Sequence, residues 1–275
     1  MAKPEYNQSL SRFILLLMTA AIAATAANLY YSQPILPLIA SEFNLSNSQL
    51  GSIPALTQIG YAFALLFISP LGDSITRRRL ISFLSCLLVF ACGTAMLAPN
   101  YSLLLISVFL IGVSANITQQ LIPFAASLVS ADQKGATLGT LMMGLTIGIL
   151  LSRTLSGFVG EQFGWRNVFL MSALLAALFG VLLRIFLPSN KPSTNLRYLA
   201  LIKSTLALFT KHKSLQHFTL SGAFWFASFN VLWATLAIYV SDEPFNYNAQ
   251  QAGLFGVIAL AGVIGASHLV NGLTN

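Results

Sequence analysis

Residues 69–80 read SPLGDSITRRRL, a polar segment rich in arginine that separates two apolar stretches, Leu50–Leu71 and Leu80–Leu97. Each stretch is close to the roughly 20 residues with which a helix crosses the hydrocarbon layer of a bilayer. Charge concentrated in a short turn between two apolar stretches is typical of consecutive membrane-spanning helices. These residues therefore predict a helical hairpin whose turn lies at the membrane surface.

The same alternation continues on both sides of this hairpin. Six more apolar stretches follow the pattern: Phe13–Ile39, Leu103–Val129, Leu138–Val159, Val168–Leu187, Phe218–Val240 and Ala252–Val270. With 56% hydrophobic and only 8% charged residues, the 275-residue chain cannot fold around one water-soluble core. We predict an all-α membrane protein with eight spanning helices and the lipid bilayer as its surroundings.

The positions of the lysine and arginine residues predict how the helices are oriented. If the N-terminus is cytosolic, 12 of the 14 basic residues lie on the cytosolic side, Arg166 lies outside and Arg153 lies within a span. This is a strong positive-inside bias, which the opposite orientation would reverse, so we predict a multi-pass protein with a cytosolic N-terminus. The net charge of +7 then reflects loops that face anionic lipid and gives no support to a nucleic-acid partner.

The spans fall into two groups, separated by a longer polar segment. Residues 1–187 are predicted to form a six-span bundle, residues 188–217 a cytosolic linker, and residues 218–275 the first two spans of a second bundle. Two bundles joined by a linker are typical of transporters built from repeated halves. Apolar residues recur in the linker at nearly helical spacing among basic ones, which predicts an amphipathic helix on the inner leaflet. A solvated linker without membrane contact is the alternative.

The segment at 69–80 resembles the loop signature of the major facilitator superfamily, G-x-L-A-D-R-x-G-R-R/K, and occupies the corresponding loop between the second and third spans. Leu71, Asp73, Arg77 and Arg78 match the signature, and Gly72 stands at its small Ala position. Three positions depart from it, because Gly, Arg and Gly are replaced by Ser69, Ser74 and Thr76. The resemblance implies a helical bundle of this family's type, with a complete six-helix first half and two helices of the second half.

By this resemblance, Asp73, Arg77 and Arg78 form a cytosolic gate. The resemblance implies that Asp73 and Arg77 latch the two bundles on the cytosolic side when the protein faces outward, and that Asp73 also addresses a helix N-terminus of the second half. That partner helix, the eleventh in the family, is not among the spans predicted here. The alternative is that Arg77–Arg79 serve only to fix the topology.

Two further segments resemble the drug and sugar efflux branch of the superfamily, namely Tyr30–Pro34 at the end of the first span and Gly164–Arg166 at the entry to the sixth. The resemblance extends over essentially the whole chain but over only about two thirds of a twelve-span member. It implies a secondary transporter of a bacterial cell inner membrane, which moves a small organic solute by alternating access. Efflux is the direction it implies.

Small residues form a stripe along the fifth span. Ala136, Thr140, Gly144, Gly148, Ser152, Ser156 and Gly160 recur at every fourth position and leave one side of the helix with little side-chain volume. Such stripes let helix backbones approach closely in lipid, so we predict a helix-packing seam from Gly144 to Gly160. It is either a purely structural seam or, as the efflux branch implies, a seam against the second bundle.

Arg153 is the one charged residue well within a predicted span. A charged side chain at that depth costs on the order of 3 kcal/mol on insertion scales, so it normally faces protein, water or a ligand. We predict that Arg153 contacts the solute or takes part in coupling. The alternative is that its long side chain reaches the outer surface or bonds to carbonyl groups of a neighbouring helix.

Polar residues in other spans are further candidates for contact with the solute. They are Asn28, Tyr31, Gln58, Asn116, Gln119, Gln120 and Asn230. Each of them could equally form a hydrogen bond between helices.

Signals of enzymes and of ATP-driven pumps are absent from the sequence. It shows no nucleotide-binding loop of the G-x-x-x-x-G-K-S/T type, no nucleophile triad and no cluster of metal ligands, and none of its seven acidic residues lies in the core of a span. We therefore predict no enzymatic activity, no metal and no cofactor. Two hypotheses compete with a transporter: a truncated, transport-inactive remnant, and a membrane scaffold or partial subunit whose missing spans come from a separate chain.

Overall fold

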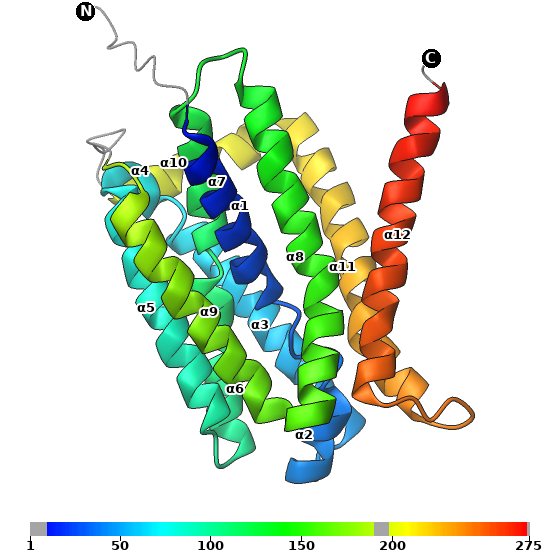
Figure 1. The fold of residues 1–275 in the computed structure, drawn as a ribbon. Helices are drawn as coiled ribbons and strands as arrows, with labels where there is room; N and C mark the ends of the chain where they lie inside the picture. Colours follow the sequence, from blue (N-terminus) through cyan, green and yellow to red (C-terminus); the bar gives the residue numbers. More distant parts are fainter. Residues whose placement is uncertain (1–9, 190–197, 274–275) are drawn as a thin grey trace, which may run out of the picture.

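The computed structural model describes residues 10–189 and 198–273, without the side chains of residue 47 and residues 263–273. It is a bundle of helices that run up and down (Figure 1), and the described residues contain no strand. The all-α prediction is therefore confirmed. The helices are α1 (Arg12–Ala27), α2 (Leu36–Phe43), α3 (Asn47–Phe67), α4 (Leu71–Ser74), α5 (Arg77–Met96), α6 (Tyr101–Ser114), α7 (Ile117–Ser127), α8 (Lys134–Phe163), α9 (Trp165–Phe186), α10 (Tyr198–Lys211), α11 (Lys213–Ser241) and α12 (Ala249–Leu273).

Each predicted span coincides with one helix or with two consecutive helices. Six helical segments of the described part are long and apolar enough to cross a bilayer. α1, and α12 as far as Gly262, are apolar but shorter. The structure thus confirms that the predicted spans are helical, while the predicted number of eight full-length spans is approximate.

The first predicted span, Phe13–Ile39, is wrong as a single helix. Turns at residues 28–35 separate α1 from α2. Pro34 has no N–H to donate to the carbonyl of Tyr30, and this carbonyl instead accepts a hydrogen bond from the backbone N–H of Gln33 at 3.1 Å. The break changes which side chains face the protein interior.

The fourth predicted span, Leu103–Val129, is divided into α6 and α7. Between them the backbone N–H of Asn116 donates to the carbonyl of Val113, three residues back, at 3.4 Å. Such i→i−3 bonds wind the chain more tightly than an α-helix. The side chain of Asn116 also donates to the hydroxyl of Ser69 at 2.7 Å, which holds the break against the end of α3.

The most extensive helix contacts join α5 to α9, α3 to α6, α1 to α8, and α8 to α12. The first three pairs lie within the predicted six-span bundle, whereas the fourth connects that bundle to the last helix. Figure 1 shows α11 and α12 on one side of the bundle, next to α8. Much of the surface of α11 is exposed, including Phe218, Phe224 and Trp225. α8 is therefore the helix that connects the two groups.

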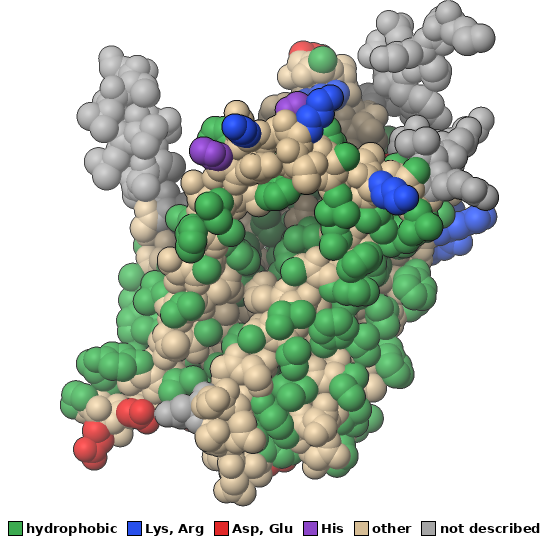
Figure 2. All heavy atoms as spheres, turned by 180° about the vertical axis from the view of Figure 1, so that it is seen from behind, with side chains coloured by type: hydrophobic (Ala, Val, Ile, Leu, Met, Phe, Trp, Pro, Cys, Tyr) green, Lys and Arg blue, Asp and Glu red, His purple; other side chains and the backbone are tan. Residues whose placement is uncertain are grey.

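α10 forms inside the predicted linker, of which residues 190–197 lie outside the described part. It lies at the end of the bundle where α1 begins (Figure 1), and the hydroxyl of Tyr198 donates to the carbonyl of Phe67 there at 2.7 Å. Figure 2 shows Lys and Arg side chains gathered at this end. A helix is thus present in the linker, while its contact with the inner leaflet stays a prediction.

Candidate functional site

Arg153 lies on α8 and is almost completely buried, with 1% of its surface exposed. Its Nη1 donates to the carbonyl of Ile149, one turn earlier, and its Nε and Nη2 have no hydrogen-bond partner among the described residues. Neither ion pair of the described part, Arg77 with Asp73 or Arg166 with Glu42, involves it. The site therefore contains a buried guanidinium with no carboxylate beside it in the described part of the chain.

Three aromatic rings surround this guanidinium. The Cζ atom of Arg153 lies 4.1 Å from the ring centroid of Trp233, 4.8 Å from that of Tyr30 and 5.5 Å from that of Phe229. Cation–π contacts stabilise a cation by about 0.5–2 kcal/mol, but they leave the N–H groups in the guanidinium plane available to donate. Trp233 and Phe229 belong to α11, and Tyr30 follows α1. The arginine thus points into the protein, between helices of both groups.

A cavity of about 140 Å³ lies next to two residues that contact Arg153, although Arg153 itself does not line it. Tyr30 and Ile149, which contact Arg153, also line the cavity. Its remaining polar lining comes from Tyr61, Thr118 and Gln119. The Nε2 of Gln119 donates to the hydroxyl of Tyr61 at 2.7 Å, whereas the buried hydroxyl of Thr118 has no partner among the described residues. The cavity therefore combines an apolar wall with a few polar groups, as small-molecule sites do.

Two predicted candidates meet between the helix groups. The Nε2 of Gln58 on α3 donates to the Oδ1 of Asn230 on α11 at 3.2 Å. Gln58 and Asn230 thus form a polar contact between the first group and α11. Asn230 directly follows Phe229, which belongs to the arginine site.

Asn28 and Tyr31 take part in helix packing and do not line the 140 Å³ cavity. The Oδ1 of Asn28 is hydrogen-bonded to the hydroxyl of Ser172 and accepts from the thiol of Cys92, which joins the end of α1 to α9 and α5. Tyr31 is buried in the main hydrophobic core. Because the helix breaks after α1, Tyr30 rather than Tyr31 reaches the arginine.

Asn116 and Gln120 bind the start of the arginine-rich loop. The Nδ2 of Asn116 donates to the hydroxyl of Ser69 at 2.7 Å, and the Nε2 of Gln120 donates to the Oδ1 of Asn116 at 2.9 Å. The Nε2 of Gln120 also donates to the backbone carbonyl of Ser69 at 3.5 Å. Both side chains therefore form hydrogen bonds to the segment that follows α3, which is the alternative to solute contact that the sequence left open.

The three residues of the predicted gate lie at the basic end of the bundle. Arg77 and Asp73 form an ion pair at 2.8 Å, and the Nε of Arg77 donates to the carbonyl of Gly72 at 3.2 Å. Arg78 donates from Nη1 to the carbonyl of Leu187 at 3.1 Å, at the C-terminus of α9, where a cation is favoured by the helix dipole. These contacts tie the loop to α5 and α9.

Two glycines of the predicted seam contact α1, and the third, Gly160, contacts Ile35 directly before α2. A Cβ added at Gly144 would lie 2.7 Å from the carbonyl oxygen of Thr19, and one added at Gly148 would lie 2.3 Å from that of Ala23. The seam therefore lies within the first group of helices. Of the two alternatives for the seam, these contacts favour the purely structural one over a seam against the second bundle.

The contact between α8 and α12 uses another face of α8. A Cβ added at Gly157 would lie 2.3 Å from the carbonyl oxygen of Ala249, and the hydroxyl of Thr154 donates to the carbonyl of Gly253 at 2.8 Å. Gly157 follows Ser156 directly and so lies about 100° around the helix from the stripe. A search for small residues at every fourth position therefore does not find the contact of Gly157 with α12.

A second polar cluster ties α2 to α9 at the end opposite to the gate. Glu42 forms an ion pair with Arg166 and accepts a hydrogen bond from the indole of Trp165 at 2.7 Å. The hydrogen bond from Arg166, with a smaller contribution from Trp165, lowers the pKa of Glu42 below its ordinary value of 4.5. Arg166 also donates to the carbonyl of Ala98 at 2.9 Å. This cluster stabilises the fold and contains none of the predicted candidates.

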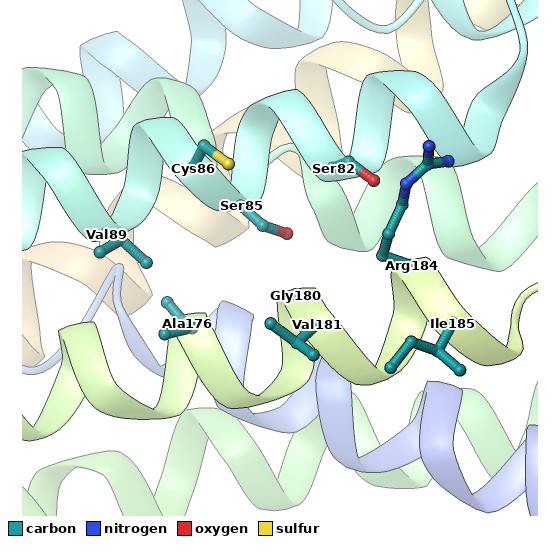
Figure 3. A pocket seen from close by; sticks show the side chains of 10 residues that line it. Ser82, Ser85, Cys86, Val89, Ala176, Gly180, Val181, Arg184 and Ile185 are labelled. Atoms are coloured by element: carbon teal, nitrogen blue, oxygen red, sulfur yellow. The ribbon is translucent and has the colours of Figure 1, made fainter.

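A larger cavity, of about 540 Å³, opens between α5 and α9 (Figure 3). Its lining is apolar apart from a few groups such as Ser82 and Arg184, and Arg184 points toward α5 at one end of it. Val181 and Ile185 on its rim are 58% and 62% exposed, which places it on the outside of the bundle. None of the predicted candidates lines it. In a bilayer the acyl chains of lipids fill such a groove, so the arginine site is the better candidate for a solute.

Sequence reasoning missed Tyr30 and Phe229 as neighbours of Arg153. Tyr30 begins the segment Tyr30–Pro34, which carried the resemblance to the efflux branch, and Phe229 precedes the candidate Asn230. The sequence analysis therefore singled out Tyr30–Pro34 and Asn230, which include or adjoin the two missed residues. Which side chain faces the arginine depends on the break at residues 28–35 and on the rotation of α11.

Comparison with known proteins agrees with this architecture. The sequence profile of the Major Facilitator Superfamily matches residues 16–273. The chain is 41% identical over 256 residues to the uncharacterized transporter YgaY of Escherichia coli O157:H7, which covers 92% of this chain and 64% of YgaY. It is 32% identical over 266 residues to the probable transporter SCO4007 of Streptomyces coelicolor, covering 96% of this chain and 62% of that protein. The chain thus spans less than two thirds of the length of these two relatives.

The fold is similar to that of solved transporters. The crystal structure of a bacterial homolog of the human lysosomal transporter Spinster, inward-facing and unoccupied, aligns with a TM-score of 0.69 at 18% sequence identity, over 92% of this chain and 61% of that one. This similarity shows the fold alone. From its sequence and its architecture together, the chain is an integral membrane protein that belongs to the Major Facilitator Superfamily of transporters.

Proposed function

We propose that this chain functions within a secondary transporter, together with helices like those of the part of YgaY that it does not match, and that this transporter carries a small organic solute across a bacterial inner membrane by alternating access, in the direction of efflux. One observation carries the proposal. The buried Arg153 of α8 contacts Phe229 and Trp233 of α11, where the first group of helices meets the helices that follow the linker. Transporters with this architecture hold the solute near the bilayer midplane, between two bundles that rock around it. Arg153 and the cavity beside Tyr30 are the site that such rocking would open to either side.

The distribution of charge supports a cytosolic N-terminus. The arginine-rich loop, α10 and the start of α1 lie at the same end of the bundle (Figure 1), and the predicted topology assigns 12 of the 14 basic residues of the sequence to the cytosolic side. Positively charged segments are retained on the cytosolic side of bacterial inner membranes.

As a cytosolic gate, Asp73, Arg77 and Arg78 would act as one unit. The ion pair between Asp73 and Arg77 and the bond from Arg78 to the end of α9 fix the loop on the first group of helices. The loop can therefore meet the second group as a rigid edge when the cytosolic side closes.

A second candidate function is that of a transport-inactive membrane unit that requires further helices from another polypeptide. The exposure of α11 favours this second candidate, because only 11% of the apolar 18-residue stretch of this helix is buried. With α11 in this little contact, the helices after the linker cannot close against the first group on both sides, as alternating access requires.

Flux measurements in reconstituted vesicles distinguish the two candidates. We expect the 275-residue chain alone to insert without transporting. A fusion with the part of YgaY that the chain does not match should show specific, saturable solute flux, which Asp73→Asn weakens. Absence of flux from the correctly inserted fusion, with a broad panel of small organic solutes, would refute the transporter. Saturable flux from the chain alone would refute the second candidate.

A further inference from the structure

The unoccupied edge of Arg153 has the shape of a carboxylate site. Nη1 of Arg153 is already used by the carbonyl of Ile149. Nε and Nη2, which share one edge of the guanidinium plane, have no partner among the described residues. Two parallel N–H donors on one edge are the arrangement that binds both oxygens of a carboxylate.

The burial and the charge of this edge favour binding of an anion. The guanidinium is 1% exposed and carries a charge that no described carboxylate neutralises. A buried charge without a partner is costly, and the rings of Trp233, Tyr30 and Phe229 compensate for it only through their faces. A ligand that approaches in the guanidinium plane would supply the missing charge and fill both remaining donors.

The cavity beside the arginine limits the size and polarity of the ligand. Its volume of about 140 Å³ is well below the 300–1,000 Å³ of typical ligand pockets. Leu145 and Phe226 contribute an apolar wall, and Gln119 and the unpartnered hydroxyl of Thr118 contribute polar groups. A body of up to about six carbon atoms, such as a benzene ring, fits this space, whereas a drug-sized molecule does not.

We propose that Arg153 binds the carboxylate of a small organic monocarboxylate, with Nε and Nη2 on its two oxygens and its body in the cavity beside Tyr30. This acid is the solute of the proposed transporter. The inference therefore rests on the proposed function for its physiological meaning, and it names the substrate class.

Equilibrium binding of radiolabelled benzoate to the purified 275-residue chain in lipid nanodiscs tests the proposal. The wild type should bind benzoate saturably. Arg153→Gln should weaken binding by at least about tenfold, and Arg153→Lys, which keeps the charge but loses the forked edge, should fall between them. Arg166→Gln is the matched control, because Arg166 also stacks on a tryptophan, at 4.2 Å from the ring of Trp165, but already has Glu42 as its partner. It should bind as the wild type does.

Competition on the wild type keeps the test independent of how well a variant folds. Unlabelled butyrate should displace benzoate, whereas the neutral benzamide and physiological chloride should not. Equal binding by wild type and Arg153→Gln, competition by benzamide, or displacement by chloride would each overturn the proposal. So would the absence of saturable benzoate and butyrate binding to the wild type. Because binding is measured without flux, a correctly inserted fusion that binds benzoate but transports nothing refutes only the proposed function. Transport by the fusion with binding independent of Arg153 refutes only this inference.

Discussion

Replacing Gly148 with alanine tests the packing of α8 against α1 by adding a single carbon atom. A Cβ at this position would lie 2.3 Å from the carbonyl oxygen of Ala23 and 2.6 Å from its Cα. Ordinary contact begins near 3.4 Å, so the two helices must separate by about 1 Å. Both contacted atoms belong to the backbone and cannot rotate away as a flexible side chain could.

The expected cost follows from this separation. Overpacking of a buried contact costs about 1–3 kcal/mol, and a gap of 0.5–1 Å forfeits roughly a quarter to a half of the dispersion attraction at the contacts that it opens. The higher helix propensity of alanine offsets up to about 1 kcal/mol of this cost. We therefore expect Gly148→Ala to destabilise the protein by about 1–2 kcal/mol.

Gly139→Ala is the matched control on the same helix, because a Cβ there meets no atom of the described residues within 4 Å. The measurement is the midpoint of thermal unfolding of the purified protein in one detergent. Gly148→Ala should lower it by about 2–4 °C per kcal/mol, while Gly139→Ala should leave it unchanged or raise it. Equal midpoints for the two variants would refute the close approach of α8 and α1.

Three further predictions concern other contacts. Because the pKa of Glu42 is lowered, the contribution of its carboxylate to stability is present above pH 4.5 and is lost as the pH falls through the lowered pKa. In that pH range the thermal midpoint of the wild type should drop more than that of Glu42→Gln. Parallel midpoint curves for the two proteins would contradict this prediction. A double-mutant cycle of Gln58→Leu and Asn230→Leu should give a coupling energy of about 0.6 kcal/mol, the usual worth of a hydrogen bond between membrane helices, and additive effects would mean that the bond contributes nothing. Cysteine introduced at position 45 should react with an impermeant maleimide from outside while cysteine at position 203 should not, and the reverse would overturn the topology.

The hydrophobic pattern was sufficient to predict a helical membrane protein and the position of nearly every helix. Apolar stretches long enough to cross a bilayer can satisfy their backbone hydrogen bonds there only as helices or closed barrels, so their length and spacing carry most of the information. The pattern failed at residues 28–35, where an apolar run continues through Pro34 but the helix does not. Hydrophobicity does not register the missing N–H of a proline.

The candidate site could be predicted only in part. Arg153 stood out because a charge within a span is costly wherever it lies, and this argument needs no knowledge of neighbouring helices. Its neighbours Tyr30, Phe229 and Trp233 come from segments far apart in the chain. Their contact depends on the turn after α1 and on the packing of α11 against the first group.

The sequence by itself determined the all-α membrane class, because this class depends on composition and hydrophobic pattern summed along the chain. It also pointed to the family, because the signature loop is a local motif. The orientation stays a prediction from the positions of the basic residues. Only the tertiary structure decided that Gly148 faces α1 while Gly157 faces α12. It also decided that the Nε and Nη2 edge of Arg153 has no partner in the described part of the chain. Each of these depends on the rotation of one helix relative to another. That rotation is set by the fit of side chains across helix contacts, which no single segment of the sequence contains.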